Sequence, residues 1–494
     1  MAQEPEDALR LAWNVQNGTA RIQAVGGAMG SLGGDITATF VNPAGLGFYR
    51  TGDFVFTPNY TFGKTGATYL GTKVNSNTNK FAIGTTGFVW GSNDNKKHSS
   101  AVSIAINQVA DFKNRIEYRG QNNQSSYSQR FLEELRNNNV KDGNVASDDF
   151  PYGTSLAFRT YWIDTVGGGT NGNFNFQSRS PIGTGLLQQN TIVSTGGITE
   201  VALGFGANIN SKLLLGGTLG IPIMRYERET EFVEADATEN NNNNFDDAIY
   251  SQGLTSTGIG FNLKAGLIYK PKEYWRLGFA VHSPTVYSIT DKNTAEITTD
   301  TENYQGSLKS QSQDITGAIS EFKYMHTTPL KLIGSASYVL REIQDVTKQK
   351  GFLTADVEYV FYPMSSYFTT DENGYNDEET KDYLKLLNGA INNAYKGAFN
   401  FRAGGELKFT TLMVRAGFAY YGNPYKDIHE EQGSRMNLSG GLGYRDKGFF
   451  VDLTYVYAMT KDVDVAYRLQ NSPYYNADIR NNAGKVLLTL GVKL

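Results

Sequence analysis

Hydrophobic and polar residues alternate along several stretches of the chain. In the last ten residues, KVLLTLGVKL, every even position from Val486 to Leu494 is apolar, and polar residues occupy most of the odd positions. Residues 398–409 and 449–460 show the same period of two, and Arg402 and Glu406 share the polar face of the first. Such segments of about ten residues predict β-strands that cross a lipid bilayer with a water-filled lumen behind them. The alternative, a large soluble β-sandwich, predicts shorter strands and turns at regular intervals.

Fourteen segments of this kind can be marked along the chain. They cover residues 53–63, 79–91, 98–112, 197–210, 212–230, 255–271, 274–288, 328–342, 350–363, 397–409, 411–422, 434–446, 448–461 and 484–494. Connections such as NINSK and RDKG are short and polar, whereas those between them are long, including 113–196, 231–254, 289–327 and 364–396. Short turns that alternate with long loops are typical of outer-membrane barrels. The sequence therefore predicts an all-β fold, a 14-stranded antiparallel transmembrane β-barrel, because closure leaves no unpaired strand edge in lipid.

The first 52 residues do not fit a membrane strand. Pro5 and the acidic residues around it are a helix start signal, and apolar residues then recur on one helical face. Residues 19–47 are too rich in glycine for a stable helix and contain Pro43, which cannot donate to a strand ladder. We therefore expect two parts, an N-terminal hatch that plugs the lumen, residues 1–52, and a barrel with long extracellular loops, residues 53–494.

Two long connections contain helical patterns. Residues 127–138 and 376–395 repeat apolar side chains at helical spacing, and we expect both to fold over the mouth of the barrel for packing, with contact to a ligand as the alternative. The run ENNNNNFDD, residues 239–247, is of low complexity and predicts a loop tip.

Composition narrows the classes of protein that remain. The chain has 494 residues, a net charge of −4, no cysteine, 30 Tyr, 28 Phe and a mean hydropathy of −0.40. No apolar run is long enough for a membrane helix, and there is no basic face for nucleic acid. The absence of cysteine excludes a disulfide framework and a thiolate metal site. The start MAQEPEDALR lacks the regions of a secretory signal, so we expect a mature exported sequence.

The sequence offers little catalytic or cofactor chemistry. His98, His282, His326 and His429 have no partner at metal-ligand spacing, and we expect them to be solvated at the surface or in the lumen. Residues 165–173 lack the Gly-Lys-Ser/Thr ending of a phosphate-binding loop. The acidic run 371–379 is either a solvated loop or a weak Ca²⁺ site. We expect no enzyme, no catalytic residue, no metal site and no cofactor.

The N-terminal region carries the most specific signal. The stretch ARIQAVGGAMGSLGGDITATFVNPAGLGFYR, residues 20–50, is followed by the aromatic segment DFVFTPNY. It resembles the N-terminus of the FadL/TodX family of outer-membrane transporters for hydrophobic compounds, particularly the branch found in Bacteroidota. The resemblance covers about the first 60 residues closely and implies a 14-stranded barrel with a lumenal hatch. Asn42, Pro43 and Ala44 match the family's Asn-Pro-Ala signature.

These residues are the candidate site. We expect Asn42 to bond neighbouring backbone in an Asx-type turn, Pro43 to stiffen it, and both to form a gate together with Phe40, Ala44 and Leu46. An ordinary loop into the first strand, without a gating role, is the alternative.

The resemblance also implies a function. It implies a channel in the bacterial outer membrane for passive uptake of hydrophobic small molecules, either long-chain fatty acids or aromatic compounds. The lipid bilayer and a hydrophobic ligand or lipid are then its partners, and no nucleic acid is expected. The main alternative is a barrel subunit or partner protein of an outer-membrane secretion or assembly complex, and a barrel enzyme is a third.

Overall fold

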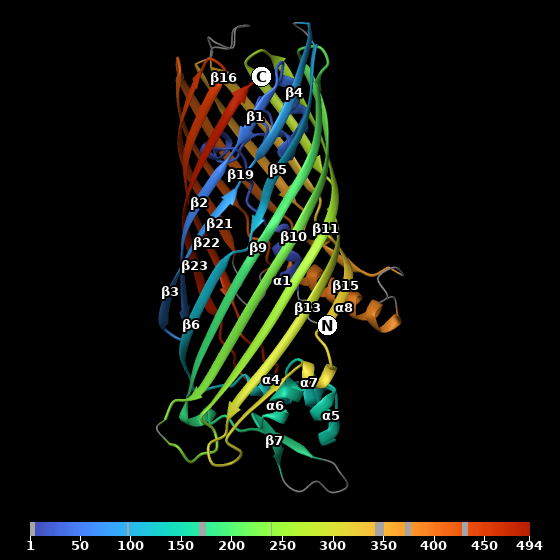
Figure 1. Cartoon of the computed structure of the whole chain (residues 1–494), viewed down its shortest axis with the longest axis vertical. Coiled ribbons are helices and arrows are strands. Elements are labelled where there is room, and N and C mark those ends of the chain that lie inside the picture. Colours follow the sequence, from blue (N-terminus) through green and yellow to red (C-terminus); the bar gives the residue numbers. More distant parts are fainter. Residues whose placement is uncertain are drawn as a thin grey trace.

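Fourteen antiparallel strands form a closed barrel (Figure 1). The computed structural model describes residues 5–95, 98–166, 174–238, 240–340, 350–370, 377–426 and 433–494. The last strand closes the barrel by pairing with the first, for example Gly491 with Val55 and Val486 with Tyr60. The prediction of a 14-stranded antiparallel barrel is therefore confirmed.

Five of the wall strands are each interrupted by a short break and consist of two labelled elements. In chain order, the wall consists of β1 (Asp53–Phe56) with β2 (Pro58–Tyr69), β3 (Thr72–Ile83) with β4 (Thr86–Asn95), β5 (His98–Asp111) with β6 (Asn114–Asn122), β9 (Leu186–Asn208), β10 (Leu213–Asp236), β11 (Asp247–Lys272), β12 (Trp275–His282) with β13 (Val286–Asp300), β15 (Ser320–Thr327) with β16 (Lys331–Leu340), β17 (Gly351–Val360), β19 (Ala398–Phe409), β20 (Leu412–Tyr421), β21 (Ser434–Asp446), β22 (Phe449–Asp464) and β23 (Ala477–Lys493). Two short strands, β14 (Ser307–Gln311) and β18 (Ser366–Phe368), extend the same sheet by pairing with β13 and β15, and β7 (Ile163–Val166) and β8 (Asn175–Ser178) form a separate two-stranded sheet.

The helices lie in the N-terminal segment and in the long connections. They are α1 (Pro5–Ala12), α2 (Ala20–Ala24), α3 (Ala38–Val41), α4 (Ser128–Asn137), α5 (Gly143–Asp148), α6 (Thr154–Arg159), α7 (Gln313–Thr316) and α8 (Glu378–Ala394), with the 3-10 helices η1 (Pro43–Phe48), η3 (Ile182–Thr184) and η5 (Tyr362–Met364). The helices expected at 127–138 and 376–395 are α4 and α8. No helix among the described residues is long and apolar enough to cross a membrane.

Several wall strands are much longer than the sequence predicts. Strand β11 has 26 residues, which corresponds to about 85 Å at 3.3 Å per residue, whereas about ten residues suffice to cross a bilayer. The expected loops 231–254 and 289–327 contain the end of β10, the start of β11, the end of β13 and all of β15. In these extensions polar residues also occupy the outward face, for example Glu231 and Ser251, so the alternation that marks a membrane strand is lost.

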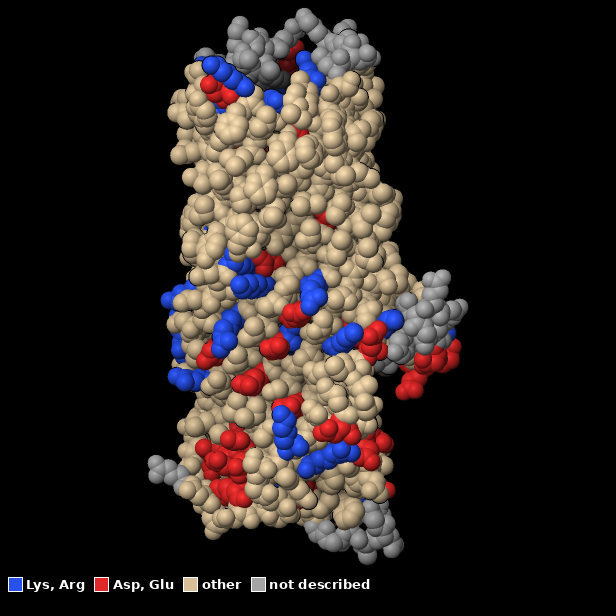
Figure 2. Space-filling model, viewed as in Figure 1, with Lys and Arg blue, Asp and Glu red and all other residues tan. Residues whose placement is uncertain are grey.

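Outward-facing side chains divide the wall into two zones (Figure 2). The zone near the C-terminus carries large exposed apolar side chains and very few charges, and we call it the apolar belt. The belt includes Phe62, Trp90, Phe205, Ile223, Phe261, Phe279, Leu353, Phe401, Leu442 and Tyr455. The other zone, in the lower half of the view, carries most of the basic and acidic side chains. The barrel therefore extends well beyond its apolar belt on the side of the long connections.

The connection between β6 and β9 forms a cap at the lower end of the barrel in Figure 1. Helices α4, α5 and α6 and the β7–β8 hairpin share one apolar core with the ends of the wall strands. Tyr127 is at its centre, with ring contacts to Phe131, Trp162, Phe232 and Tyr250. The cap, residues 123–185 as far as described, therefore covers the barrel mouth through an apolar core that it shares with the wall.

Helix α8 has a different position from the one expected. It lies on the flank of the barrel rather than over the mouth, where β17 and β19 end at Val360 and Ala398 and the wall is low (Figure 1). Its buried residues Leu384, Leu387 and Ile391 share an apolar cluster with α1. The helix packs there because the low wall leaves the apolar face of α1 uncovered.

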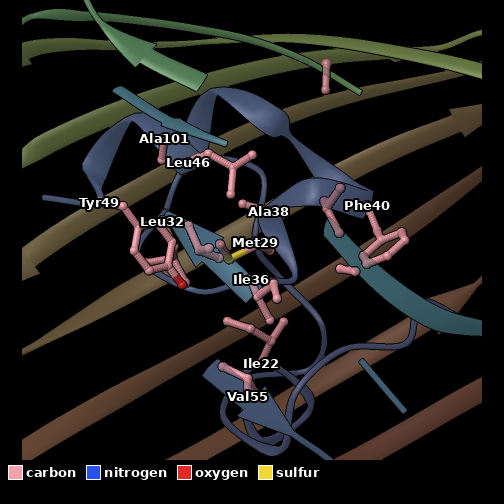
Figure 3. Packing of buried hydrophobic residues seen from close by; sticks show 14 of the residues in the cluster. Ile22, Met29, Leu32, Ile36, Ala38, Phe40, Leu46, Tyr49, Val55 and Ala101 are labelled. Atoms are coloured by element: carbon pink, nitrogen blue, oxygen red, sulfur yellow. The ribbon is translucent and has the colours of Figure 1, made fainter. Parts of the chain in front are cut away.

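The N-terminal segment, residues 5–48, lies inside the barrel. Segment α2 packs against β20 to β23, and η1 packs against β5, β9, β10 and β11. From residue 20 to residue 47 almost every side chain is buried. Its apolar residues form a cluster with inward residues of the wall, including Val55 and Ala101 (Figure 3). At this level the lumen is filled with protein.

Candidate functional site

Asn42 organises the contact between the N-terminal segment and the wall. Its side-chain Oδ1 accepts a hydrogen bond from the Ala44 N–H at 3.1 Å, which forms an Asx-type turn into η1. Its Nδ2 donates to the carbonyl oxygens of Gly30 at 2.6 Å, Leu267 at 3.1 Å and Phe279 at 3.4 Å. Pro43 opens the helix at a position where no backbone donor is needed. One buried amide thus joins two turns of the segment to strands β11 and β12.

The wall is smooth where this turn lies against it. Ala101, Gly206, Gly216, Gly266 and Ala280 stand in one row across β5, β9, β10, β11 and β12. A Cβ atom added at Gly216 would lie 2.3 Å from the Pro43 carbonyl carbon, and one at Gly266 would lie 1.9 Å from Asn42 Oδ1. The turn therefore packs against wall backbone, and these two glycines are required for close approach.

Phe40, Ala44 and Leu46 are buried in this same region. Phe40 and Leu46 belong to the apolar cluster shown in Figure 3, where they point to different parts of the wall. Ala44 packs separately against Leu214 and Ile268. The structure thus brings all five candidate gate residues into one buried turn and its two flanks.

A second contact holds the preceding turn. The Asp356 carboxylate accepts hydrogen bonds from the backbone N–H groups of Met29 at 2.9 Å and Gly30 at 3.1 Å. The Ser31 hydroxyl lies 2.7 Å from that of Ser335 and 2.5 Å from that of Ser337. No local motif marks these wall residues, so sequence analysis missed them. The only signal in the sequence is that polar residues occupy alternate, inward-facing positions along these strands.

Charged residues of the lumen are buried, and the expectation that they face water is wrong at this level. Arg402 is 2% exposed and pairs with Glu358 at 3.3 Å. Arg415, also 2% exposed, pairs with Glu406 at 2.6 Å and Asp452 at 2.5 Å. The N-terminal segment displaces the water, and ionic pairing compensates the burial of the charges.

Two histidines are buried rather than solvated. His282 Nε2 lies 2.8 Å from the Val41 carbonyl oxygen, so this ring contacts the N-terminal segment next to Asn42. His326 packs against the Tyr367 ring at 4.6 Å between centroids. His98 is exposed, as expected, and His429 lies outside the described residues. Ser283 bonds to backbone groups instead of His282, so the two do not act as a pair.

A cavity of about 100 Å³ lies between α1, the turn after it and the wall. Leu11, Val15 and Phe40 contribute apolar surface, and the remaining lining is largely polar. The polar lining includes Asn17, Asn107, Glu200, Lys264, His282, Lys331, Glu358 and Arg402. Its volume is well below the roughly 300–1,000 Å³ that encloses a drug-sized ligand. A larger molecule can therefore pass this level only if the N-terminal segment moves.

The described residues contain no group of three or more His, Asp or Glu side chains placed to hold a metal ion. The acidic run 371–379 falls mostly outside the described residues, and so does most of the glycine-rich run 165–173.

Several solved structures share this architecture. The Pseudomonas putida toluene transporter TodX superimposes with a TM-score of 0.53 at 12% identity, over 97% of this chain and 99% of that one. The chain has the FadL/TodX fold. A Pseudomonas aeruginosa FadL homologue gives a TM-score of 0.53 at 13% identity over 97% and 99% of the two chains. The Ralstonia pickettii toluene transporter TbuX gives 0.50 at 13% identity over 98% and 100%.

At these identities the likeness concerns the FadL/TodX fold alone. No protein-family model and no curated protein sequence matches the chain. The neighbours with this fold are named as toluene transporters and a monoaromatic hydrocarbon channel.

Proposed function

We propose that this protein is an outer-membrane channel for the passive uptake of hydrophobic small molecules, with residues 5–48 as a displaceable hatch. The observation that carries the proposal is the contact between hatch and wall. It consists of hydrogen bonds, an ion pair between Arg21 and Glu406 at 3.6 Å, and close packing against wall glycines. Such a contact closes the lumen and can open without unfolding the barrel.

The apolar belt supports a position in a membrane. It carries the exposed apolar and aromatic side chains that lipid requires, and the short turns and the C-terminus lie at its end of the barrel. In an outer membrane these turns face the periplasm, and the cap and α8 face outward.

The low wall beside α8 is the proposed entrance. The cap closes the axial mouth with a packed aromatic core, whereas α8 covers the flank with a single helix. A ligand that displaces α8 reaches the apolar residues around α1 and then the cavity at Leu11 and Val15. Displacement of the hatch releases it on the periplasmic side.

The proposed ligand class is based on the solved structures with this fold and on the apolar residues at the proposed entrance. Structures with this fold are named as toluene transporters and a monoaromatic hydrocarbon channel. We propose a hydrophobic compound, with long-chain fatty acids and aromatic compounds as the two candidate classes.

A reversible cross-link tests whether the hatch must move. The chain has no cysteine, so S31C/S337C creates the only thiol pair, at a position where the two hydroxyl oxygens are 2.5 Å apart. The control S337C/T354C links two wall strands whose hydroxyl oxygens are 2.9 Å apart. Uptake of labelled oleate and labelled toluene is measured in whole cells, with oxidant and after reduction.

Oxidation of S31C/S337C is expected to stop uptake of the transported compound, and reduction is expected to restore it, while S337C/T354C stays active throughout. Uptake that continues through the oxidised S31C/S337C barrel would show that the hatch does not move. Wild-type cells that take up neither compound, combined with stable copurification of other outer-membrane proteins, would favour the role of a partner protein.

A further inference from the structure

Outward residues of β22, β23, β2 and β3 form regular rows across the wall. Lys461 pairs with Arg480, and Arg480 pairs with Gly66. One row closer to the belt, Lys64 pairs with Asn482. Lys73 lies on the other side of Gly66, because a Cβ atom added there would be 3.5 Å from Lys73 Cε and 3.9 Å from the Arg480 carbonyl oxygen. We call Lys64, Lys73, Lys461 and Arg480 the basic patch.

The basic patch is exposed and unneutralised. All four side chains are exposed, and within the described residues none of them forms an ion pair with an acid. In Figure 2, basic side chains gather directly below the tan belt on the left, over the region of β2 and β3 in Figure 1. Asp478 is the outward acid of these rows, and it lies farther from the belt than Arg480.

Several basic residues elsewhere on the outer wall differ in this respect. They pair with acids on their own face, Arg225 with Glu227, Lys292 with Glu321 at 3.3 Å, and Lys309 with Glu296 at 2.8 Å. Lys323 also pairs with Glu321, at 3.4 Å. Among the described residues, the four residues of the basic patch lack the acids that neutralise these other groups.

Aromatic residues occupy the rows next to the basic patch on the side of the apolar belt. Phe62 pairs with Gly484, and Tyr60 pairs with Phe81 and Val486. Tyr455 and Tyr457 continue these rows on β22. All of these aromatic side chains are exposed on the lipid side of the wall, 67% in the case of Phe81. An apolar surface thus continues directly into a cationic one.

We propose that the basic patch and the adjoining aromatic rows of the belt bind a phosphorylated lipid of the outer leaflet. The acyl chains lie on the aromatic rows, and the phosphate groups meet the ammonium and guanidinium groups at the height where a headgroup begins. Arg480 suits a phosphate because its planar guanidinium donates two parallel hydrogen bonds. The inference rests on the orientation proposed above, with the cap outside, and does not depend on transport.

The experiment uses the full chain in zwitterionic detergent and fluorescent lipid A that carries both phosphates as the probe. The patch variant is K64Q/K73Q/K461Q/R480Q. The matched control is R225Q/K292Q/K309Q/K323Q, which removes the same charge from the acid-paired basic residues. Both replace exposed side chains, so both are expected to retain the barrel, as checked by circular dichroism.

Binding to the patch variant is expected to be weaker by at least tenfold, since each basic residue near an anionic lipid surface contributes roughly fivefold. The control should remain close to wild type, and lipid A without phosphates should bind wild type at least tenfold more weakly. Added salt should weaken the wild-type complex, because exposed charges are screened.

Three results would overturn the inference. Equal loss in patch and control variants would mean a non-specific charge effect. Equal binding of dephosphorylated lipid A would remove the role of phosphate. Displacement by an excess of inorganic phosphate would assign the patch to free anions instead of a lipid. None of these results depends on the uptake experiment, so the two proposals can fail separately.

Discussion

At the scale of single residues, Asn42 and Pro43 contribute to the Asn-Pro-Ala turn in different ways. Asn42 supplies both an acceptor for the turn and donors for three carbonyl oxygens, which an aspartate or an alanine in its place could not do. Pro43 has no N–H to leave unpaired in a dry contact. The wall residues that face the turn, Gly216 and Gly266, have no side chains, and this allows the backbone of the turn to approach closely.

Adding one methyl group on the lumen side should disturb the hatch. Gly216→Ala places a Cβ atom 2.3 Å from Pro43 backbone, and we expect a loss of about 1–3 kcal/mol in stability and a higher single-channel conductance. The neighbouring Gly217 has only one atom near such a Cβ, 3.8 Å away. Gly217→Ala is therefore the control, and we expect it to have the stability and the single-channel conductance of the wild type. Equal conductance of the two variants would contradict close packing of the turn against the wall.

At the scale of elements, the pair α1 and α8 joins the inside of the barrel to its outside. Helix α1 begins the hatch, and α8 covers the flank where the wall is low. A movement of α8 thus changes the packing of the hatch directly. The cap differs from this pair, because its core is built from aromatic rings, whereas the contact between α1 and α8 is smaller.

Adjacent leucines on α8 test that contact. Leu387 is 6% exposed and Leu386 is 75% exposed. Leu387→Ala is expected to destabilise the helix on the flank by about 2–4 kcal/mol, because a buried leucine leaves a cavity, and to make α8 sensitive to protease. Leu386→Ala should change neither property. Protection of α8 in the Leu387 variant would show that the helix is held by other contacts.

The docking of the cap should depend on pH through Glu234. This carboxylate accepts hydrogen bonds from Ser126, from Ser180 at 2.8 Å and from Gln188 at 2.8 Å, and no basic side chain among the described residues pairs with it. Burial raises the pKa of Glu234 above its ordinary value of 4.5. The folded cap thus holds this proton to a higher pH than the unfolded chain, so its stability should fall as the pH rises from 4.5 through the raised pKa.

Hydrogen exchange of the cap, corrected for the intrinsic rate, measures this dependence. Glu234→Gln should remove it, because the amide cannot titrate. A dependence that persists in this variant would assign the effect to another group.

The sequence predicts these elements unevenly, for physical reasons. Period-two alternation identifies strands in the belt, since lipid on one side and polar contacts on the other impose different residue types, as at Phe401 and Arg402. It fails in the extensions of β10 and β11, where both faces contain polar residues. The Asn-Pro-Ala turn is visible as a local pattern, whereas its partners Gly216, Gly266 and Asp356 are scattered over the chain and meet only in the closed barrel.

At the scale of the whole molecule, the apolar belt occupies one end of a barrel that is far taller than a membrane. The extensions of β10, β11 and β13, the cap and α8 all lie on the same side of the belt. This asymmetry sets the proposed orientation, on which the entrance and the lipid site depend.

Single cysteines test the orientation. Asn242 and Asn471 lie in connections on the side of the cap, and Asn210 and Lys447 lie in short turns at the other end. Because the natural chain has no cysteine, an impermeant thiol reagent on whole cells should label N242C and N471C only. Labelling of N210C and K447C alone would mean that the barrel has the opposite orientation. Labelling of all four would mean that the reagent had crossed the membrane.

The hatch also joins the two ends of the chain, and this has a consequence for assembly. The Ala20 N–H donates to Thr489 in the last strand at 2.8 Å, and the Ala20 carbonyl accepts from Thr454 at 2.6 Å. A segment near residue 20 is therefore enclosed by strands more than 400 positions later in the sequence. Contacts of such long sequence separation form slowly, because a large loop must close before they contribute. We infer that the final strand completes the barrel around a segment already in place, so that the hatch acts as a template for closure before it acts as a gate.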